Sequence, residues 1–163
     1  MLLQRSHALL LATVAVLVGG TLGIAGSTSP RKSVADETRT PHGRIVFVMA
    51  TGLEDSEEMT SAIQDAKLAK ESGYLEEVDL LAYDRGVQAL ADRFGTPNTR
   101  AERTAALVRE ARAAGVHVIA CRASLDAMKI GKNRLDPEPD EIVPNGAAKL
   151  AELVSRGFQV VRY

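Results

Sequence analysis

Cys121 is the residue whose type and position are best suited to chemistry. It lies where an apolar segment, residues 116–120, ends and a helical segment begins, and Arg122 and Lys129 follow it. Cations and the N-terminus of a helix both stabilise a thiolate, which is the nucleophilic form of cysteine. Free cysteine is also among the most buried residue types, so a purely space-filling role stays open.

Histidine and metal chemistry have less support. His117 precedes Cys121 by four residues on one predicted strand, a separation of about 13 Å, so we expect no direct ion pair between them. We expect His117 to be a core or interface residue instead. Met49, His117 and Cys121 are suitable copper ligands by type, but their spacing does not favour such a site. The sequence therefore predicts no metal site, and the chemistry of Cys121 requires no cofactor.

Several function classes are excluded by composition and by absent motifs. The 163 residues include 20 basic and 21 acidic side chains, so the basic surface of a dedicated nucleic-acid binder is not expected. A single cysteine excludes an intrachain disulfide and a CxxC pair. The turn that begins at Thr51-Gly52 lacks the glycine patterns of nucleotide-phosphate loops, and no GxSxG elbow is present.

The first 25 residues predict an export signal. From residue 8 to residue 25 every side chain is apolar, Gly or Thr, and Gly23 and Ala25 fit cleavage after Ala25. An uncleaved anchor is an alternative, because the segment approaches the roughly 20 residues that span a bilayer. A buried helix of a soluble protein is a third. Cleavage or anchoring places the domain outside the cytoplasm, as in the periplasm, with membrane contact only through an uncleaved segment.

Two further regions follow. Residues 26–43 are polar, contain two prolines and have no apolar period, which predicts a flexible linker. From residue 44 onward, predicted strands at 45–50, 78–83, 116–120, 141–143 and 158–162 alternate with helical segments. Such strands pair in parallel through right-handed crossovers. Residues 44–163 therefore predict a three-layer α/β/α Rossmann-like domain with a five-stranded, mainly parallel sheet.

Ligands of such sheets gather at the carboxyl ends of the strands, beside the N-termini of helices. Asp84 is one candidate, although an Asp at a strand end commonly caps the next helix instead. Two charged regions predict solvated surfaces rather than sites. They are the third predicted helix, about residues 98–115, and the proline-rich connection at residues 136–140. The full set of candidate binding residues is Thr51, Gly52, Asp84, Arg122, Lys129, Asn145 and Gly146.

Residues 115–131, G-V-H-V-I-A-C-R-A-S-L-D-A-M-K-I-G, resemble the central segment of the DsrE/DsrF-like family, in which a strand ends in cysteine and a short helix follows. Residues 142–163 are similar to that family's ending, a small-residue helix and a terminal strand. The resemblance covers about residues 44–163. It implies a Rossmann-like subunit that assembles into trimers or hexamers. It also implies that the strand-end cysteine, here Cys121, accepts a persulfide sulfur and passes it to a partner protein.

Two hypotheses for the function follow. In the first, the protein is an exported DsrE-like persulfide carrier, or sulfurtransferase, that acts through Cys121. Arg122, Lys129 and the following helix N-terminus would then stabilise negative charge on the sulfur, and a protein would donate or accept that sulfur. In the second, the protein is a non-catalytic oligomeric binding module, which predicts that Cys121 is buried and slow to alkylate.

Overall fold

The computed structural model describes residues 41–91 and 99–163, which lie within one compact unit, residues 37–163. The predicted export signal and all but the last three residues of the predicted linker lie outside the described residues. The strands are β1 (Arg44–Met49), β2 (Glu77–Ala82), β3 (His117–Cys121), β4 (Glu141–Val143) and β5 (Phe158–Arg162). The α-helices are α1 (Ser56–Glu71), α2 (Thr99–Ala113), α3 (Arg122–Ala127) and α4 (Gly146–Ser155), and the 3-10 helices are η2 (Leu53–Asp55), η3 (Asp84–Leu90) and η4 (Lys132–Arg134).

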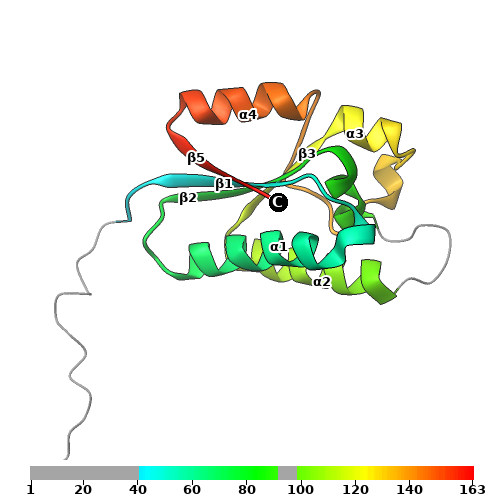
Figure 1. The fold of residues 1–163 in the computed structure, drawn as a ribbon, viewed down its shortest axis with the longest axis horizontal. Helices are drawn as coiled ribbons and strands as arrows, with labels where there is room; N and C mark the ends of the chain where they lie inside the picture. The colour runs from blue at the N-terminus through cyan, green and yellow to red at the C-terminus, as the bar shows by residue number, and fades with distance from the viewer. Residues whose placement is uncertain (1–40, 92–98) are drawn as a thin grey trace, which may run out of the picture. The chain divides into compact units, whose positions relative to one another are not determined.

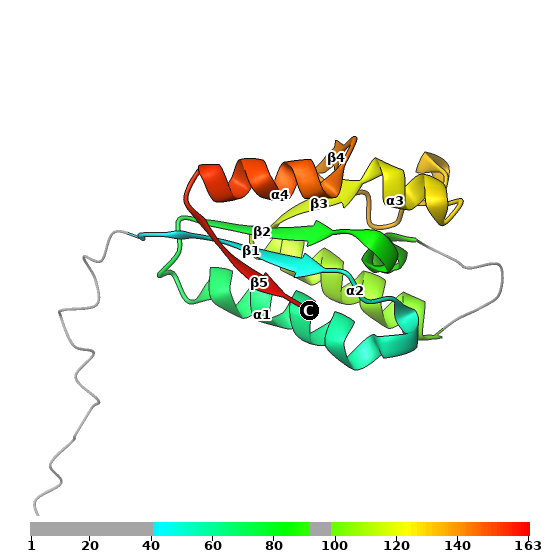
Figure 2. The same ribbon diagram turned by 45° about the horizontal axis from the view of Figure 1, so that its top comes forward.

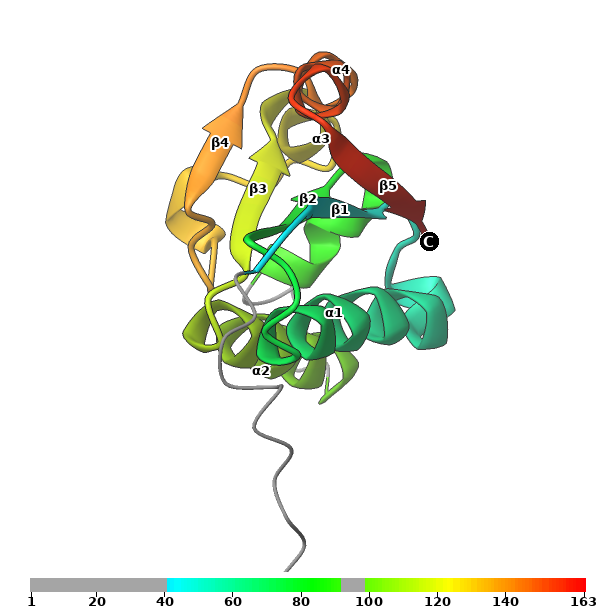
Figure 3. The same ribbon diagram turned by 90° about the vertical axis from the view of Figure 1, so that its left-hand side faces the viewer.

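The five strands form one sheet in the order β4-β3-β2-β1-β5, and every neighbouring pair is parallel. Figure 3 shows β4 and β5 at the two edges. Apolar runs without alternation, such as Val46 to Met49, are typical of strands that helices cover on both faces. The predicted α/β fold with a five-stranded parallel sheet is confirmed.

Helices form a layer on each face of the sheet (Figure 1): α1 and α2 on one side, α3 and α4 on the other. Alternate residues of β1 divide between the two cores. Phe47 and Met49 pack on the α1 and α2 side, whereas Val46 and Val48 pack with Leu153 of α4. Each such buried side chain stabilises the fold by about 1.5–3 kcal/mol relative to an exposed one.

Side-chain caps fix where two helices begin. The Asp55 carboxylate accepts a hydrogen bond from the Glu58 N–H at 3.3 Å, and the Asn145 side chain accepts one from the Ala148 N–H at 3.1 Å. Both caps satisfy N–H groups that have no partner within the helix. The second cap places the first turn of α4 beside the end of β3.

The charged surface around α2 contains ion pairs that the sequence did not predict. Arg109 pairs with Asp136 at 2.9 Å, and Arg112 makes a two-pronged pair with Asp140. These side chains remain at the surface, as predicted, and α2 packs beside the proline-rich connection so that opposite charges meet. Within the two described stretches, no helix combines the length and apolar character that a membrane crossing requires.

Candidate functional site

Cys121 is the last residue of β3, and it lies directly before α3. Its side chain is buried, with 1% exposed. The Gly146 N–H, at the first residue of α4, donates a hydrogen bond to the Cys121 Sγ at 3.2 Å. The sulfur thus faces the N-terminus of a ten-residue helix, where the helix dipole favours negative charge.

The contact between Cys121 and α4 requires glycine at position 146. A Cβ at Gly146 would lie 2.5 Å from the Tyr83 Cδ2 and 3.2 Å from the Cys121 Cβ. Both distances are shorter than ordinary carbon–carbon contacts of 3.5–4.0 Å. Only a residue without a side chain lets the α4 backbone approach the sulfur this closely.

A cavity of about 290 Å³ lies beside Cys121 at the carboxyl end of the sheet. Tyr83 reaches it from β2, because Ala82 pairs with Ala120 and the next residues of the two strands are therefore level. Figure 2 shows η3 and α3 next to each other beyond the ends of β2 and β3. The complete lining is Tyr83, Asp84, Cys121, Ala123, Ser124, Ala127, Met128 and Asn145.

Asp84 adopts a conformation that residues other than glycine seldom adopt, with φ 50°. Its N–H donates to the Ser124 Oγ at 2.9 Å, which ties the start of η3 to α3. The expected capping role for the Asp84 side chain is wrong, since η3 begins with no side-chain cap. In the described part of the chain, no hydrogen bond or ion pair engages the Asp84 carboxylate, which is exposed.

Some predicted site residues come together, and others do not. Cys121, Asp84 and Asn145 line the cavity, and Gly146 contacts the sulfur through its backbone. Arg122 and Lys129 are exposed and do not line it. Their expected position beside the sulfur is therefore corrected.

The two cations point elsewhere for local reasons. Arg122 is the first residue of α3, and its side chain extends into solvent. Lys129 has φ 55° and follows the last turn of α3, where a left-handed residue ends the helix. Proximity in sequence to Cys121 therefore does not bring either charge to the cavity.

Thr51 and Gly52 belong to a neighbouring turn rather than to the cavity wall. The Leu53 N–H donates to the Gln88 Oε1 at 2.9 Å, and Arg85 pairs with Glu54 at 2.8 Å. These contacts join η2 to η3. The Thr51 Oγ1 is buried and has no hydrogen-bond partner in the described part of the chain.

Ser124, Tyr83 and Met128 are site residues that sequence reasoning missed. Ser124 lies in α3, three residues after Cys121. At this spacing, the side chains of a helix and of the residue before it lie on the same side. Tyr83 immediately follows a predicted central strand. These signals were present in the sequence, but using them required the helix start and the strand register.

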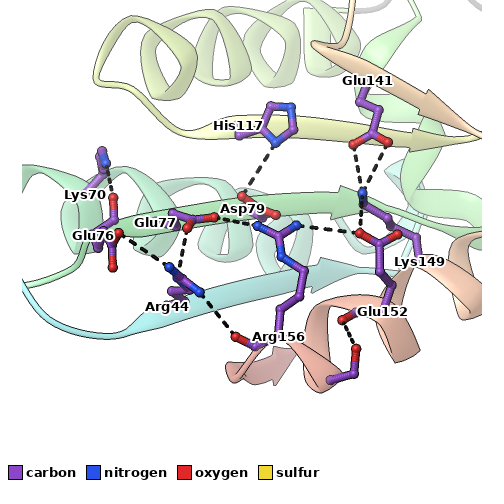
Figure 4. A network of polar contacts seen from close by, with 11 residues as sticks. Arg44, Lys70, Glu76, Glu77, Asp79, His117, Glu141, Lys149, Glu152 and Arg156 are labelled. Atoms are coloured by element: carbon purple, nitrogen blue, oxygen red, sulfur yellow. Dashed lines mark hydrogen bonds and ion pairs between the residues drawn. The ribbon is translucent and has the colours of Figure 1, made fainter.

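His117 lies at the opposite, amino end of the sheet (Figure 4). Its Nδ1 is 3.6 Å from the Asp79 Oδ1, too long for a hydrogen bond but close enough for an ion pair. Asp79 is 5% exposed, and the His117 side chain is about half-exposed, so the core alternative for His117 is wrong, whereas the interface alternative stays a prediction. The neighbouring Asp79 carboxylate raises the pKa of His117, against the opposing effect of partial burial.

Figure 4 also shows the ion pairs that join α4 to the sheet. Arg156, just after α4, pairs with Glu77 of β2 at 3.1 Å. Lys149 lies 3.1 Å from Glu141 of β4 and 3.2 Å from Glu152. Burial acts to lower the pKa of Lys149, but hydrogen bonds to the two glutamates raise it overall. These pairs keep α4 aligned across the sheet.

Metal ligation by Met49, His117 and Cys121 has no geometric support. His117 and Cys121 stand at opposite ends of β3. Among residues 41–91 and 99–163, no three or more His, Cys, Asp or Glu side chains are grouped to hold a metal ion.

Comparisons with known proteins agree with this architecture. A protein of unknown function from Methanobacterium thermoautotrophicum, MTH1491, is 21% identical with a TM-score of 0.60, covering 75% of this chain and 100% of that chain. The ychN protein from E. coli is 17% identical with a TM-score of 0.58, covering 75% of this chain and 100% of that chain. A search for curated relatives of similar sequence found no match.

At these identities the solved structures show the fold, and the family follows from the sequence pattern as a whole. The model of the DsrE/DsrF-like family matches residues 43–163, which include all five strands and the Cys121 cavity. The chain therefore belongs to the DsrE/DsrF-like family, which is linked to sulfur relay.

Proposed function

We propose that this protein is an exported sulfur carrier that holds a persulfide on Cys121. The observation that carries the proposal is the position of the Cys121 sulfur, which accepts the Gly146 N–H and borders a cavity of about 290 Å³. A fixed N–H donor and a helix N-terminus stabilise a thiolate or a persulfide anion. Membership of a family linked to sulfur relay supports the same chemistry.

The chemical step is a sulfur transfer between thiols. The Cys121 thiolate attacks the outer sulfur of a donor persulfide, R–S–SH, and a new sulfur–sulfur bond forms on Cys121. The bond within the donor breaks, and R–S⁻ leaves and takes a proton from water. The products are Cys121–S–SH and R–SH, so no oxidant or reductant is consumed. Transfer to an acceptor thiolate or protein repeats the step in reverse.

Export and self-association are part of the proposal. The apolar segment at residues 8–25 and the small residues before position 26 support export. Val154 of α4 and Val160 of β5 are 51% and 43% exposed, and a groove of about 290 Å³ with Leu150 and Val160 in its walls lies beside them. Exposed apolar side chains of this kind support self-association, and the family resemblance implies a trimer or a hexamer. Light scattering of the purified protein measures the subunit number.

Cys121→Ser tests sulfur carriage. After incubation with a persulfide donor, we expect the intact mass of the wild-type protein to rise by about 32 Da, one sulfur atom, and to return on reduction. We expect no gain for Cys121→Ser, because Cys121 is the chain's one cysteine. Thermal unfolding of both proteins confirms that the variant is folded. A reducible gain in the folded variant excludes Cys121 as the carrier.

A second candidate function is a non-catalytic binding module of the same fold. The 1% exposure of Cys121 favours it, because a buried thiol reacts slowly. The two functions differ in the alkylation of Cys121 by iodoacetamide under native and denaturing conditions. Alkylation confined to the denatured protein, together with no sulfur gain, favours the binding module.

A further inference from the structure

The cavity beside Cys121 has an acidic wall. Asp84 is the one lining residue with a charged side chain, and no hydrogen bond or ion pair between described residues neutralises it. The cations expected nearby, Arg122 and Lys129, do not line the cavity. A molecule in the cavity therefore meets an uncompensated carboxylate as well as the sulfur.

The backbone of Asp84 is held firmly in this wall. Its φ of 50° is maintained by the hydrogen bond from its N–H to Ser124 Oγ, and Ser124 is 8% exposed. The Gly86 N–H donates to the Tyr83 carbonyl at 2.9 Å, which closes the same turn. A Cβ at Gly86 would lie 1.9 Å from the Met49 carbonyl oxygen, so the turn packs directly on the end of β1. The backbone of Asp84 cannot move away without displacing its packed neighbours.

We propose that Asp84 determines which sulfur donors reach Cys121: it selects small aminothiol persulfides and disulfides, and it disfavours anionic donors. This inference rests on the proposed function of Cys121. The Asp84 carboxylate pairs with the protonated amine of the donor through a charge-assisted hydrogen bond. The same carboxylate repels donors such as thiosulfate or inorganic polysulfide, which carry negative charge close to the reacting sulfur.

The size of the cavity agrees with a small donor. Its volume of about 290 Å³ lies at the lower end of ligand pockets, which are usually about 300–1,000 Å³. In the transfer, the Cys121 thiolate attacks the outer sulfur of ⁺H₃N–R–S–SH, and ⁺H₃N–R–S⁻ leaves. The Asp84 carboxylate holds the ammonium group, and it neither gains nor loses a proton.

Three symmetric disulfides of similar length test this selectivity. Cystamine carries two ammonium groups, bis(2-hydroxyethyl) disulfide is neutral, and 3,3′-dithiodipropionate carries two carboxylates. Each forms a mixed disulfide with Cys121 and releases one thiolate, and intact mass measures the rate. We expect the wild-type protein to react at least about tenfold faster with cystamine than with dithiodipropionate, after division by the rates of a free model thiol. Added salt should reduce this ratio, since salt screens exposed charges.

Asp84→Asn and a matched control locate the effect. Asparagine tolerates positive φ better than most residues, so this substitution removes the charge and keeps the turn. We expect the cystamine preference to fall severalfold in Asp84→Asn while the rate with the neutral disulfide stays within about twofold. Asp126→Asn removes the same charge from an exposed position on α3 that does not line the cavity. We expect it to retain the wild-type preference.

Each other outcome has a distinct meaning. Equal charge preference in the wild-type protein and Asp84→Asn overturns the inference, and sulfur carriage by Cys121 still stands. If Asp84→Asn and Asp126→Asn lose the cystamine preference equally, the preference comes from the overall charge of the protein. That result also overturns the inference. If no disulfide modifies Cys121 in the folded protein and all three do so after unfolding, the proposed function itself fails.

Discussion

The two ends of the parallel sheet differ in whether their charged side chains are paired. At the amino end, acidic and basic side chains meet in pairs: Arg44 lies 2.8 Å from Glu77, which also pairs with Arg156. At the carboxyl end, the cavity beside Cys121 holds one carboxylate, that of Asp84, and no described side chain neutralises it. Compensated charges fix the positions of elements, whereas an uncompensated charge is available to a ligand.

Helix α4 connects the two ends. Its first residue, Gly146, donates to the Cys121 sulfur, and Arg156, which follows its last residue, pairs with Glu77 and Glu152. A cation at the C-terminus of a helix is also favoured by the helix dipole. The ion pairs at the amino end therefore help to hold the N–H donor at the carboxyl end in place.

Gly146→Ala gives the largest expected effect, and it is confined to the carboxyl end. The new Cβ overlaps Tyr83 and moves the N–H away from the Cys121 sulfur. A hydrogen bond to a charged group contributes about 1.5–3 kcal/mol, so we expect Cys121 to react with iodoacetamide at least about tenfold more slowly at fixed pH. We expect crowding to lower the free energy of unfolding by about 1–3 kcal/mol.

Gly131→Ala is the matched control for this glycine. A Cβ there would meet the Asn133 Oδ1 at the end of a flexible side chain, so we expect little change in reactivity or stability. An unchanged alkylation rate in folded Gly146→Ala would show that the backbone donor has no influence on the thiol.

Asp140→Asn tests how much the charged contacts at the amino end contribute to the free energy of unfolding. Burial acts to raise the pKa of Asp140, but hydrogen bonds from Arg112 and from the Val118 N–H lower it overall, below the usual 3.8. A carboxyl group with a lowered pKa stabilises the fold above its unfolded pKa, and that stabilisation is lost as pH falls through the folded value. We expect Asp140→Asn to cost about 1–2 kcal/mol at pH 7, and less below about pH 4, in urea unfolding.

Glu138→Gln is its control, since Glu138 lies 3.9 Å from Lys132 and both side chains are largely exposed. We expect a change of at most about 0.5 kcal/mol there. Neither substitution should alter the rate of Cys121 alkylation. A lower rate of Cys121 alkylation in Asp140→Asn would contradict the independence of Cys121 from the Arg112–Asp140 pair.

His117→Asn gives the smallest expected effect, and its size depends on pH. The Asp79 carboxylate raises the pKa of His117 above 6.5, partial burial opposes this, and Asp140 and Glu141 add to the increase. A raised pKa means that protonated His117 stabilises the fold fully below the unfolded value and loses this effect as pH rises through the folded value. We expect a loss of about 0.5–1 kcal/mol at pH 5.5 that declines above pH 6.5.

Urea unfolding of the wild-type protein and His117→Asn between pH 5 and pH 9 measures this difference. His42→Asn is the matched control, because His42 is exposed and lies outside the ion-pair network. A loss that grows with rising pH would contradict the pairing of His117 with Asp79.

The fold was largely predictable because its signals are local. Apolar runs mark the strands, Asp55 and Asn145 cap two helices, and the carboxyl-end rule selects Asp84, Asn145 and Cys121. The direction in which a side chain points depends on more than the neighbouring sequence. Arg122 and Lys129 are close to Cys121 in sequence, but the way α3 begins and ends turns them to solvent. Ser124 reaches the cavity only because α3 begins directly after Cys121.

The hydrogen bond that reaches the Cys121 sulfur comes from the peptide backbone. An alanine scan of the polar residues near the thiol would leave this donor intact, because every residue except proline supplies the same N–H. The scan would therefore miss the fixed hydrogen-bond partner of this sulfur. The exception is Gly146, where even the smallest side chain overlaps its neighbours. Sensitivity to substitution should accordingly peak at a residue that has no functional group.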